Sequence, residues 1–141
     1  MQEKKYNFGI LATHPIQYYV PWYKAMARHP LINLKVFYCH RQTPHSQAQA
    51  GFDVDFDWDI PLLEGYDYRF LDNRAKHPGV YTFFGCNTPE ISGIIKEGHF
   101  DAFMVSGWAA LSFWQAIIAC WRVSTPILIR GNSAFLRFYS F

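Results

Sequence analysis

Short apolar runs alternate with helix-like segments along most of this chain, and that alternation constrains its fold more than any other feature. Each run is four to six residues long, which is typical of strands buried in a parallel sheet. The runs lie at 8–13, 34–38, 68–71, 102–105 and 126–130. Strands that alternate with helices favour a parallel sheet with helices packed on both faces. We therefore predict an α/β domain built on about five parallel strands.

Helix signals fill the segments between these runs. Aromatic residues recur at helical spacing between positions 19 and 26, and Pro21 suits the first turn of that helix. The Asn-Thr-Pro-Glu sequence at 87–90 is typical of a helix start, and Gly98 is placed to end that helix. Residues 109–122 are apolar nearly all round, which predicts a deeply packed helix.

The size and charge of the chain argue against several classes of protein. Its length suits one domain, so residues 1–141 are predicted to form a single Rossmann-like unit. The net charge is only +2 and no stripe of Lys or Arg is present, which argues against nucleic-acid binding. The N-terminus has no signal-peptide pattern, and the apolar stretch 109–121 is too short to span a bilayer. We expect a cytoplasmic protein in which Cys39, Cys86 and Cys120 are reduced, with peripheral contact at the inner face of the membrane as an alternative.

The order of the strands determines where a ligand is expected. In a doubly wound sheet of order 3-2-1-4-5, the order reverses between the first and fourth strands, and ligands bind beyond the carboxyl ends of the strands there. The loop after the first strand spans 13–17, and the loop after the fourth spans 106–108. Residues 130–133, which follow the fifth strand, lie beside them. These three loops are where the sequence predicts a site.

The loops carry side chains that suit a polar ligand. His14 and Gln17 can hydrogen-bond hydroxyl or phosphate oxygens, and Arg130 can bind a phosphate or carboxylate in bidentate fashion. Trp108 offers a flat apolar face, and Gly107 permits close approach of the backbone. Each of the four side chains also has a structural interpretation. His14 would be a structural hydrogen-bonding group, Gln17 a helix cap, Trp108 a core aromatic residue and Arg130 the partner of a nearby acid.

No metal or cofactor site is predicted. The acidic run 53–59 carries Asp at every second position, but a calcium loop requires Gly at its sixth position, where Trp58 stands. We interpret this run as a solvated acidic edge, with a D-x-D metal site as the less favoured alternative. The six His residues lack zinc-ligand spacing, and the sequence contains no G-x-G-x-x-G or Walker loop.

Four stretches are similar, in the expected order, to one protein family, and together they cover nearly the whole chain. The first reads Ile-Leu-Ala-Thr-His-Pro-Ile-Gln-Tyr, and the second, Phe-Asp-Trp-Asp-Ile-Pro-Leu-Leu-Glu-Gly-Tyr followed by Tyr-Arg-Phe-Leu, is the most specific. The stretches are 10–18 with Pro21 and Trp22, 56–66 with 68–71, 101–108, and 130–133. In these residues the chain resembles a bacterial branch of the family 4 glycosyltransferases.

The resemblance implies a GT-B fold, in which two Rossmann-like domains face each other across a cleft. Such enzymes transfer a sugar from a nucleotide diphosphate donor to a saccharide or lipid-linked acceptor, with retention of configuration and without a metal. The N-terminal domain mainly holds the acceptor, and the C-terminal domain holds the donor through an E-x7-E type motif. The chain is therefore expected to be an acceptor-side domain for polysaccharide biosynthesis. It is also expected to stop early, at Phe141, to lack the donor domain and to be inactive alone.

The chain departs from the family pattern at three places. His14-Pro15 replaces a Gly-rich first loop, residues 106–108 stand where many relatives carry a catalytic-type His, and Asn132 stands where an acidic residue is frequent. Loop position and resemblance together predict His14 as the catalytic residue. The predicted substrate-binding residues are Gln17, Ser106, Gly107, Trp108, Arg130 and Asn132.

A second hypothesis belongs to a different class of protein. A sheet that ends after its fifth strand leaves an open edge and exposed apolar surface, which favours self-association. The chain would then be a non-catalytic α/β binding module or subunit, completed by a partner chain or by a second copy of itself.

Overall fold

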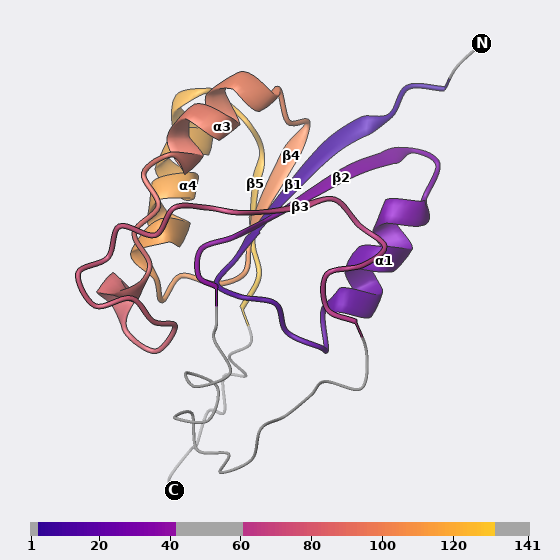
Figure 1. The fold of residues 1–141 in the computed structure, drawn as a ribbon. Coiled ribbons are helices and arrows are strands. Elements are labelled where there is room, and N and C mark those ends of the chain that lie inside the picture. Colours follow the sequence, from indigo (N-terminus) through magenta and orange to yellow (C-terminus); the bar gives the residue numbers. More distant parts are fainter. Residues whose placement is uncertain (1–2, 42–60, 132–141) are drawn as a thin grey trace, which may run out of the picture.

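The computed structural model describes residues 3–41 and 61–131 of the chain (Figure 1). It contains a sheet of five strands in the order β3-β2-β1-β4-β5, and all four pairings are parallel. The strands are β1 (Tyr6–Ala12), β2 (Ile32–Tyr38), β3 (Tyr68–Phe70), β4 (Ala102–Val105) and β5 (Ile127–Ile129). The predicted α/β fold, the strand number and the 3-2-1-4-5 order are confirmed.

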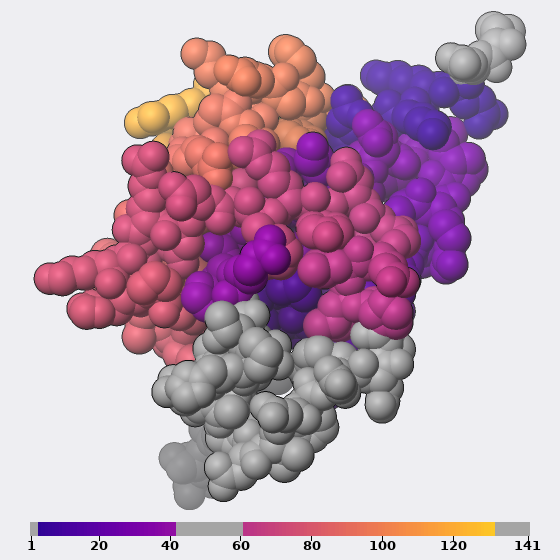
Figure 2. Space-filling view, viewed as in Figure 1, coloured from indigo at the N-terminus to yellow at the C-terminus, as the bar shows by residue number. Residues whose placement is uncertain are grey.

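Helices cover both faces of the sheet, as predicted. The helices are α1 (Val20–Arg28), α3 (Ile91–Gly98) and α4 (Leu111–Arg122), with a short 3-10 turn η1 (Phe83–Gly85) before α3. In Figure 1, α1 lies on one side of the strands, and α3 and α4 lie together on the other. Figure 2 shows that the segment containing β3 and η1 forms much of the face in view.

Successive residues of each central strand pack into opposite cores. In β1, Leu11 joins the core under α3 and α4, whereas Ile10 joins the core under α1. Phe103 and Met104 of β4 divide in the same way. Because side chains of a strand alternate between the two faces of a sheet, a short apolar run supplies both cores at once. This double burial explains why these runs are continuously apolar.

Pro21 lies in the first turn of α1, as predicted, and His29 caps the end of the helix. The end of α3 differs from the prediction. The helix includes Gly98, and His99 takes the left-handed conformation instead, with φ of 48°. A Cβ at position 98 would overlap the ring of Phe100, so the close approach of that ring requires a glycine there.

The prediction for α4 was wrong in one respect. The helix buries one face, which includes Phe113, Ala116 and Cys120, but it is not packed all round. Trp114 and Trp121 are 42% and 79% exposed on the other side. The apolar sequence of this segment therefore predicted a helix, but it did not show which face of the helix packs on the core.

All three cysteines lie within the described residues, and each is free and buried, as predicted for reduced thiols. Among the helices that the structure describes, none is both long enough and apolar enough to cross a membrane.

Candidate functional site

The loops that follow β1, β4 and β5 meet at the carboxyl edge of the sheet. The Ser106 backbone N–H donates to the carbonyl of Leu11 at 3.0 Å, and the Arg130 N–H donates to the carbonyl of Val105 at 2.9 Å. Val105 is also the register partner of Ile129, so Ser106 and Arg130 are the next residues along two neighbouring strands. The structure thus brings together Ser106 and Arg130 beside the reversal point between β1 and β4, as the sequence predicted.

The Arg130 side chain reaches from the end of β5 to the beginning of α1. Its guanidinium carbon lies 4.0 Å from the centre of the Tyr19 ring and 4.9 Å from the centre of the Trp22 ring. A guanidinium over an aromatic face is held by the negative charge of that face. These two rings therefore hold the cation at the beginning of α1.

Three buried polar atoms in this region, one of them on the guanidinium itself, lack a hydrogen-bond partner among the described residues. They are the hydroxyl oxygens of Tyr23 and Ser106 and the Nη1 of Arg130, and all three are shielded from solvent. Burial raises the pKa of Tyr23 to about 12, and the neighbouring Ser106 and Arg130 act in the opposite direction. Ser106 is thus close to the Tyr23 hydroxyl, although the two oxygens do not meet in a hydrogen bond of good geometry.

His14 lies in the loop after β1, next to a second histidine. Its Nδ1 is 2.9 Å from the Thr13 hydroxyl oxygen, and the His40 backbone N–H donates to the Thr13 carbonyl at 2.8 Å. Burial, with a smaller contribution from His40, lowers the pKa of His14 to about 4. The imidazole is therefore neutral near pH 7, where it offers one donor and one acceptor. A pKa this low suits hydrogen bonding better than proton abstraction at neutral pH.

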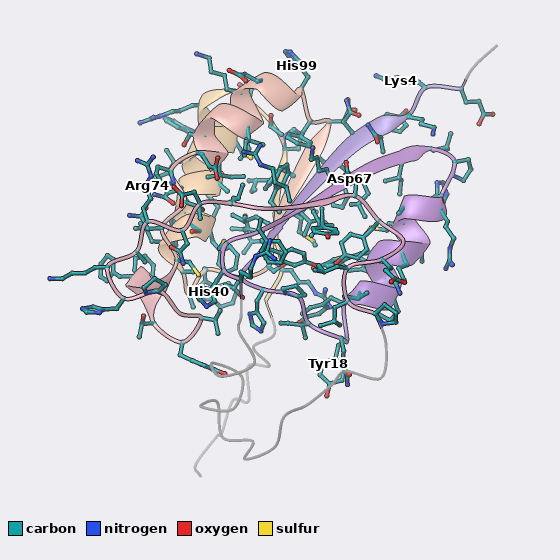
Figure 3. All side chains as sticks on the ribbon, in the orientation of Figure 1. Lys4, Tyr18, His40, Asp67, Arg74 and His99 are labelled. Atoms are coloured by element: carbon teal, nitrogen blue, oxygen red, sulfur yellow. The ribbon has the colours of Figure 1, made fainter. Side chains whose placement is uncertain are left out.

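Figure 3 gives the orientation of this edge in the molecule. The labelled His40 and Tyr18 lie at the carboxyl edge of the sheet, whereas Lys4 and His99 lie at the opposite edge.

The loop after β4 presents Trp108 to solvent. The Trp108 side chain is 45% exposed, so its interpretation as a core aromatic residue is wrong. Gly107 has φ of 138°, a conformation that L side chains rarely adopt. The Trp114 indole N–H donates to the Trp108 carbonyl at 2.8 Å, which ties the loop to α4. A flat apolar ring on a held loop is the kind of surface against which a sugar ring packs.

Not every predicted site residue is placed in this cluster. Gln17 is partly buried in the loop before α1, and no described residue hydrogen-bonds its side chain. Asn132 and the acidic run 53–59 lie outside the described residues. Within those residues, no group of three His, Cys, Asp or Glu side chains is arranged to hold a metal ion.

Sequence reasoning missed the contribution of α1 to the site. Tyr19, Trp22 and Tyr23 stand out in the sequence only as a helical apolar pattern. Their position in the sequence also indicated that they lie near the site, because the helix after the first loop begins at the carboxyl edge of the sheet. His40 carried the same signal, since it follows the end of β2.

A cavity of about 400 Å³ lies elsewhere, between α3 and α4. Its lining includes Ser92, Lys96 and Arg122, and none of the residues predicted from the sequence. Its position on the helices, away from the strand ends, separates it from the candidate site.

No protein-family model matches this chain, and neither a curated protein nor a solved structure is similar enough to count as a match.

Proposed function

We propose that this chain is an acceptor-binding domain of a retaining glycosyltransferase that uses a nucleotide-sugar donor. The observation that carries the proposal is the grouping of Trp108, Ser106 and Arg130 on adjoining loops at the reversal point of the sheet. The four stretches that resemble family 4 glycosyltransferases support the same function. The 3-2-1-4-5 sheet is compatible with a GT-B domain, and with many other α/β proteins as well.

The proposed roles follow from the chemistry of each side chain. Trp108 packs against a sugar ring of the acceptor, and Gln17 hydrogen-bonds its hydroxyls. His14, the catalytic residue of this proposal, contacts the reacting hydroxyl. The transfer breaks the bond between the anomeric carbon and the diphosphate oxygen, forms one to the hydroxyl oxygen, and passes the hydroxyl proton to the leaving diphosphate. Because the pKa of His14 is near 4, the imidazole orients the hydroxyl as a neutral hydrogen-bonding group.

The proposed place of action follows from these substrates. Nucleotide-sugar donors and a role in polysaccharide biosynthesis place the chain in the cytoplasm, and a lipid-linked acceptor would bring it to the inner face of the membrane. The donor is a substrate in this scheme, and the scheme requires no metal or other cofactor.

Saccharide binding at Trp108 provides the test. Saturation-transfer NMR with the full chain would screen neutral saccharides, sugar phosphates and nucleotide sugars. We expect Trp108→Ala to weaken binding of the saccharide that responds by about two- to tenfold, since aromatic stacking contributes roughly 0.5–1.5 kcal/mol. Trp121→Ala, on the exposed face of α4, is the matched control and should bind normally. Equal binding by both variants, or no binding by any of these compounds, would count against the function.

One observation favours the alternative of a non-catalytic module completed by a partner. Trp114, Ile118 and Trp121 are all exposed and lie about one turn apart on α4. Leu128 and Ile129 of β5 are about half exposed, and among the strands of residues 3–41 and 61–131, β5 is the last one at its side of the sheet. Such apolar surface beside an edge strand is typical of an interface.

Light scattering coupled to size-exclusion chromatography separates the two functions. Under the alternative, the wild-type chain is a dimer or larger oligomer and the double variant Trp114→Ser/Trp121→Ser is a monomer. A wild-type chain that stays monomeric at high concentration would count against self-association.

A further inference from the structure

The buried atoms of Tyr23, Ser106 and Arg130 point to a ligand that the fold itself does not supply. A buried polar atom without a partner costs about 1–3 kcal/mol, and more when it belongs to a charged group. Three such atoms occur in one place, and they are the only unpaired buried side-chain polar atoms across residues 3–41 and 61–131. Tyr23 interacts with both Ser106 and Arg130, and the three residues belong to three different segments of the chain. One shared partner can therefore serve all three atoms.

The chemistry of the three groups identifies that partner. Arg130 can only donate hydrogen bonds, and the hydroxyls of Tyr23 and Ser106 can each donate one. An oxygen atom that accepts from all three must be rich in lone pairs, as the oxygens of phosphate and carboxylate are. A water molecule can accept only two hydrogen bonds, so it would have to donate the third to one of the two hydroxyls.

The surroundings of Arg130 favour an anion over water. None of the ion pairs among the described residues involves Arg130, so no described carboxylate neutralises the guanidinium. The rings of Tyr19 and Trp22 hold it in place, which lowers the entropic cost of binding. Arg130 as a whole is only partly buried, although its Nη1 is shielded from solvent.

We propose that Arg130, Ser106 and Tyr23 form an oxyanion-binding site between the ends of β4 and β5 and the beginning of α1. The site takes a phosphate or carboxylate group. The identity of the molecule that carries this group rests on the proposed function. For an acceptor-binding domain, it is a saccharide acceptor that carries a phosphate group or contains an acidic sugar.

Binding of inorganic phosphate to the full chain tests the site directly. Phosphate is titrated in a calorimeter against chloride of equal ionic strength, and thermal unfolding is followed in the same buffers. We expect phosphate to bind the wild type and to raise its Tm, since a ligand that binds only the folded state stabilises it. Arg130→Gln should raise the Kd about tenfold or more, and Arg130→Lys by less, because a charge remains without the bidentate geometry.

Two further variants separate the site from general charge effects. Arg41→Gln is the matched control, because the Arg41 guanidinium also stacks on a ring, that of Phe70, at 4.2 Å. It should bind phosphate as the wild type does. Tyr23→Phe keeps the buried ring and removes only the hydroxyl, so it should weaken binding without loss of the fold. Equal Kd values for Arg130→Gln and Arg41→Gln, or no binding of phosphate by a folded wild type, would overturn the proposal.

A comparison of ligands distinguishes the sources of the anion and keeps this proposal separate from the proposed function. Glucose 1-phosphate, glucuronate and glucose are titrated in the same way. Tighter binding of glucose 1-phosphate or of glucuronate than of glucose, lost in Arg130→Gln, would support the site and identify the anionic group. Phosphate binding through Arg130 combined with no response to any sugar would leave the oxyanion site standing and remove the glycosyltransferase function. Sugar binding that depends on Trp108 but not on Arg130 would support the glycosyltransferase function and overturn the oxyanion site.

Discussion

The indole N–H of Trp114 donates a hydrogen bond to the carbonyl oxygen of Trp108 at 2.8 Å, across the first turn of α4. This bond joins a helix that packs on the sheet to the loop that carries the exposed Trp108 ring. Trp114→Phe keeps an aromatic ring and removes the donor. We expect the free energy of unfolding to fall by about 0.5–1.5 kcal/mol, the net value of one hydrogen bond.

Amide hydrogen exchange shows which part of the chain loses stability when this hydrogen bond is removed. In Trp114→Phe, the amides of 106–110 should exchange faster, while those of β1 stay protected. Trp121→Phe, on the same helix, is the control for the loss of an indole. Equal exchange in the two variants would show that the bond does not hold the loop.

Burial of His14 makes stability depend on pH. Its pKa is near 4 in the folded chain and about 6.5 when unfolded, so the unfolded state binds the proton more readily. Above about pH 6.5 both states are neutral at this position, and the free energy of unfolding falls as the pH drops from there toward 4. A shift of this size corresponds to at most about 3 kcal/mol. His40, whose pKa is also lowered by burial, contributes in the same direction.

Urea unfolding between pH 7 and pH 4 measures this dependence. His14→Asn should flatten the pH profile, whereas His77→Asn, in an exposed loop, serves as the control for the loss of an imidazole. A profile that remains as steep in His14→Asn as in the wild type would contradict the assignment.

Thr88 and Ser112 form a buried polar pair between the start of α3 and the start of α4. The Thr88 hydroxyl donates to the Ser112 oxygen at 2.8 Å, and both residues are fully buried. Thr88→Val should lower the free energy of unfolding by about 1–3 kcal/mol, because it leaves the Ser112 hydroxyl without this partner. The double variant Thr88→Val/Ser112→Ala should lose less than the sum of the two single variants. Additive losses in denaturant unfolding would show that the two hydroxyls are not coupled.

Two glycines should respond to alanine in opposite directions. A Cβ at Gly9 in β1 would overlap the buried ring of Phe103, so Gly9→Ala should cost about 1–3 kcal/mol. Gly93 lies in α3, where a Cβ would meet no atom of another residue within 4 Å, so Gly93→Ala should stabilise the chain by about 0.5–1 kcal/mol. Thermal unfolding of the two variants checks both signs, and a stabilising Gly9→Ala would contradict the packing of β1 against Phe103.

The alternation of apolar runs and helices was sufficient to predict the class of fold, the strand order and the loops at the reversal point. These features depend on local signals, namely short runs buried on both faces and helix boundaries such as Pro21, and on general rules for parallel sheets. The placement of Ser106 and Arg130 on neighbouring loops followed directly, since each is the first residue after its strand.

The sequence by itself therefore determined which loops gather at the edge of the sheet. Only the tertiary structure decided which side chains meet there and in what state. Tyr23 looked like any core aromatic residue, and its hydroxyl joined the site because α1 packs with that side chain close to Ser106 and Arg130. The exposed face of α4 and the low pKa of His14 have the same origin. Burial and desolvation depend on what the rest of the chain places around a residue, and the residue's own identity does not specify its neighbours.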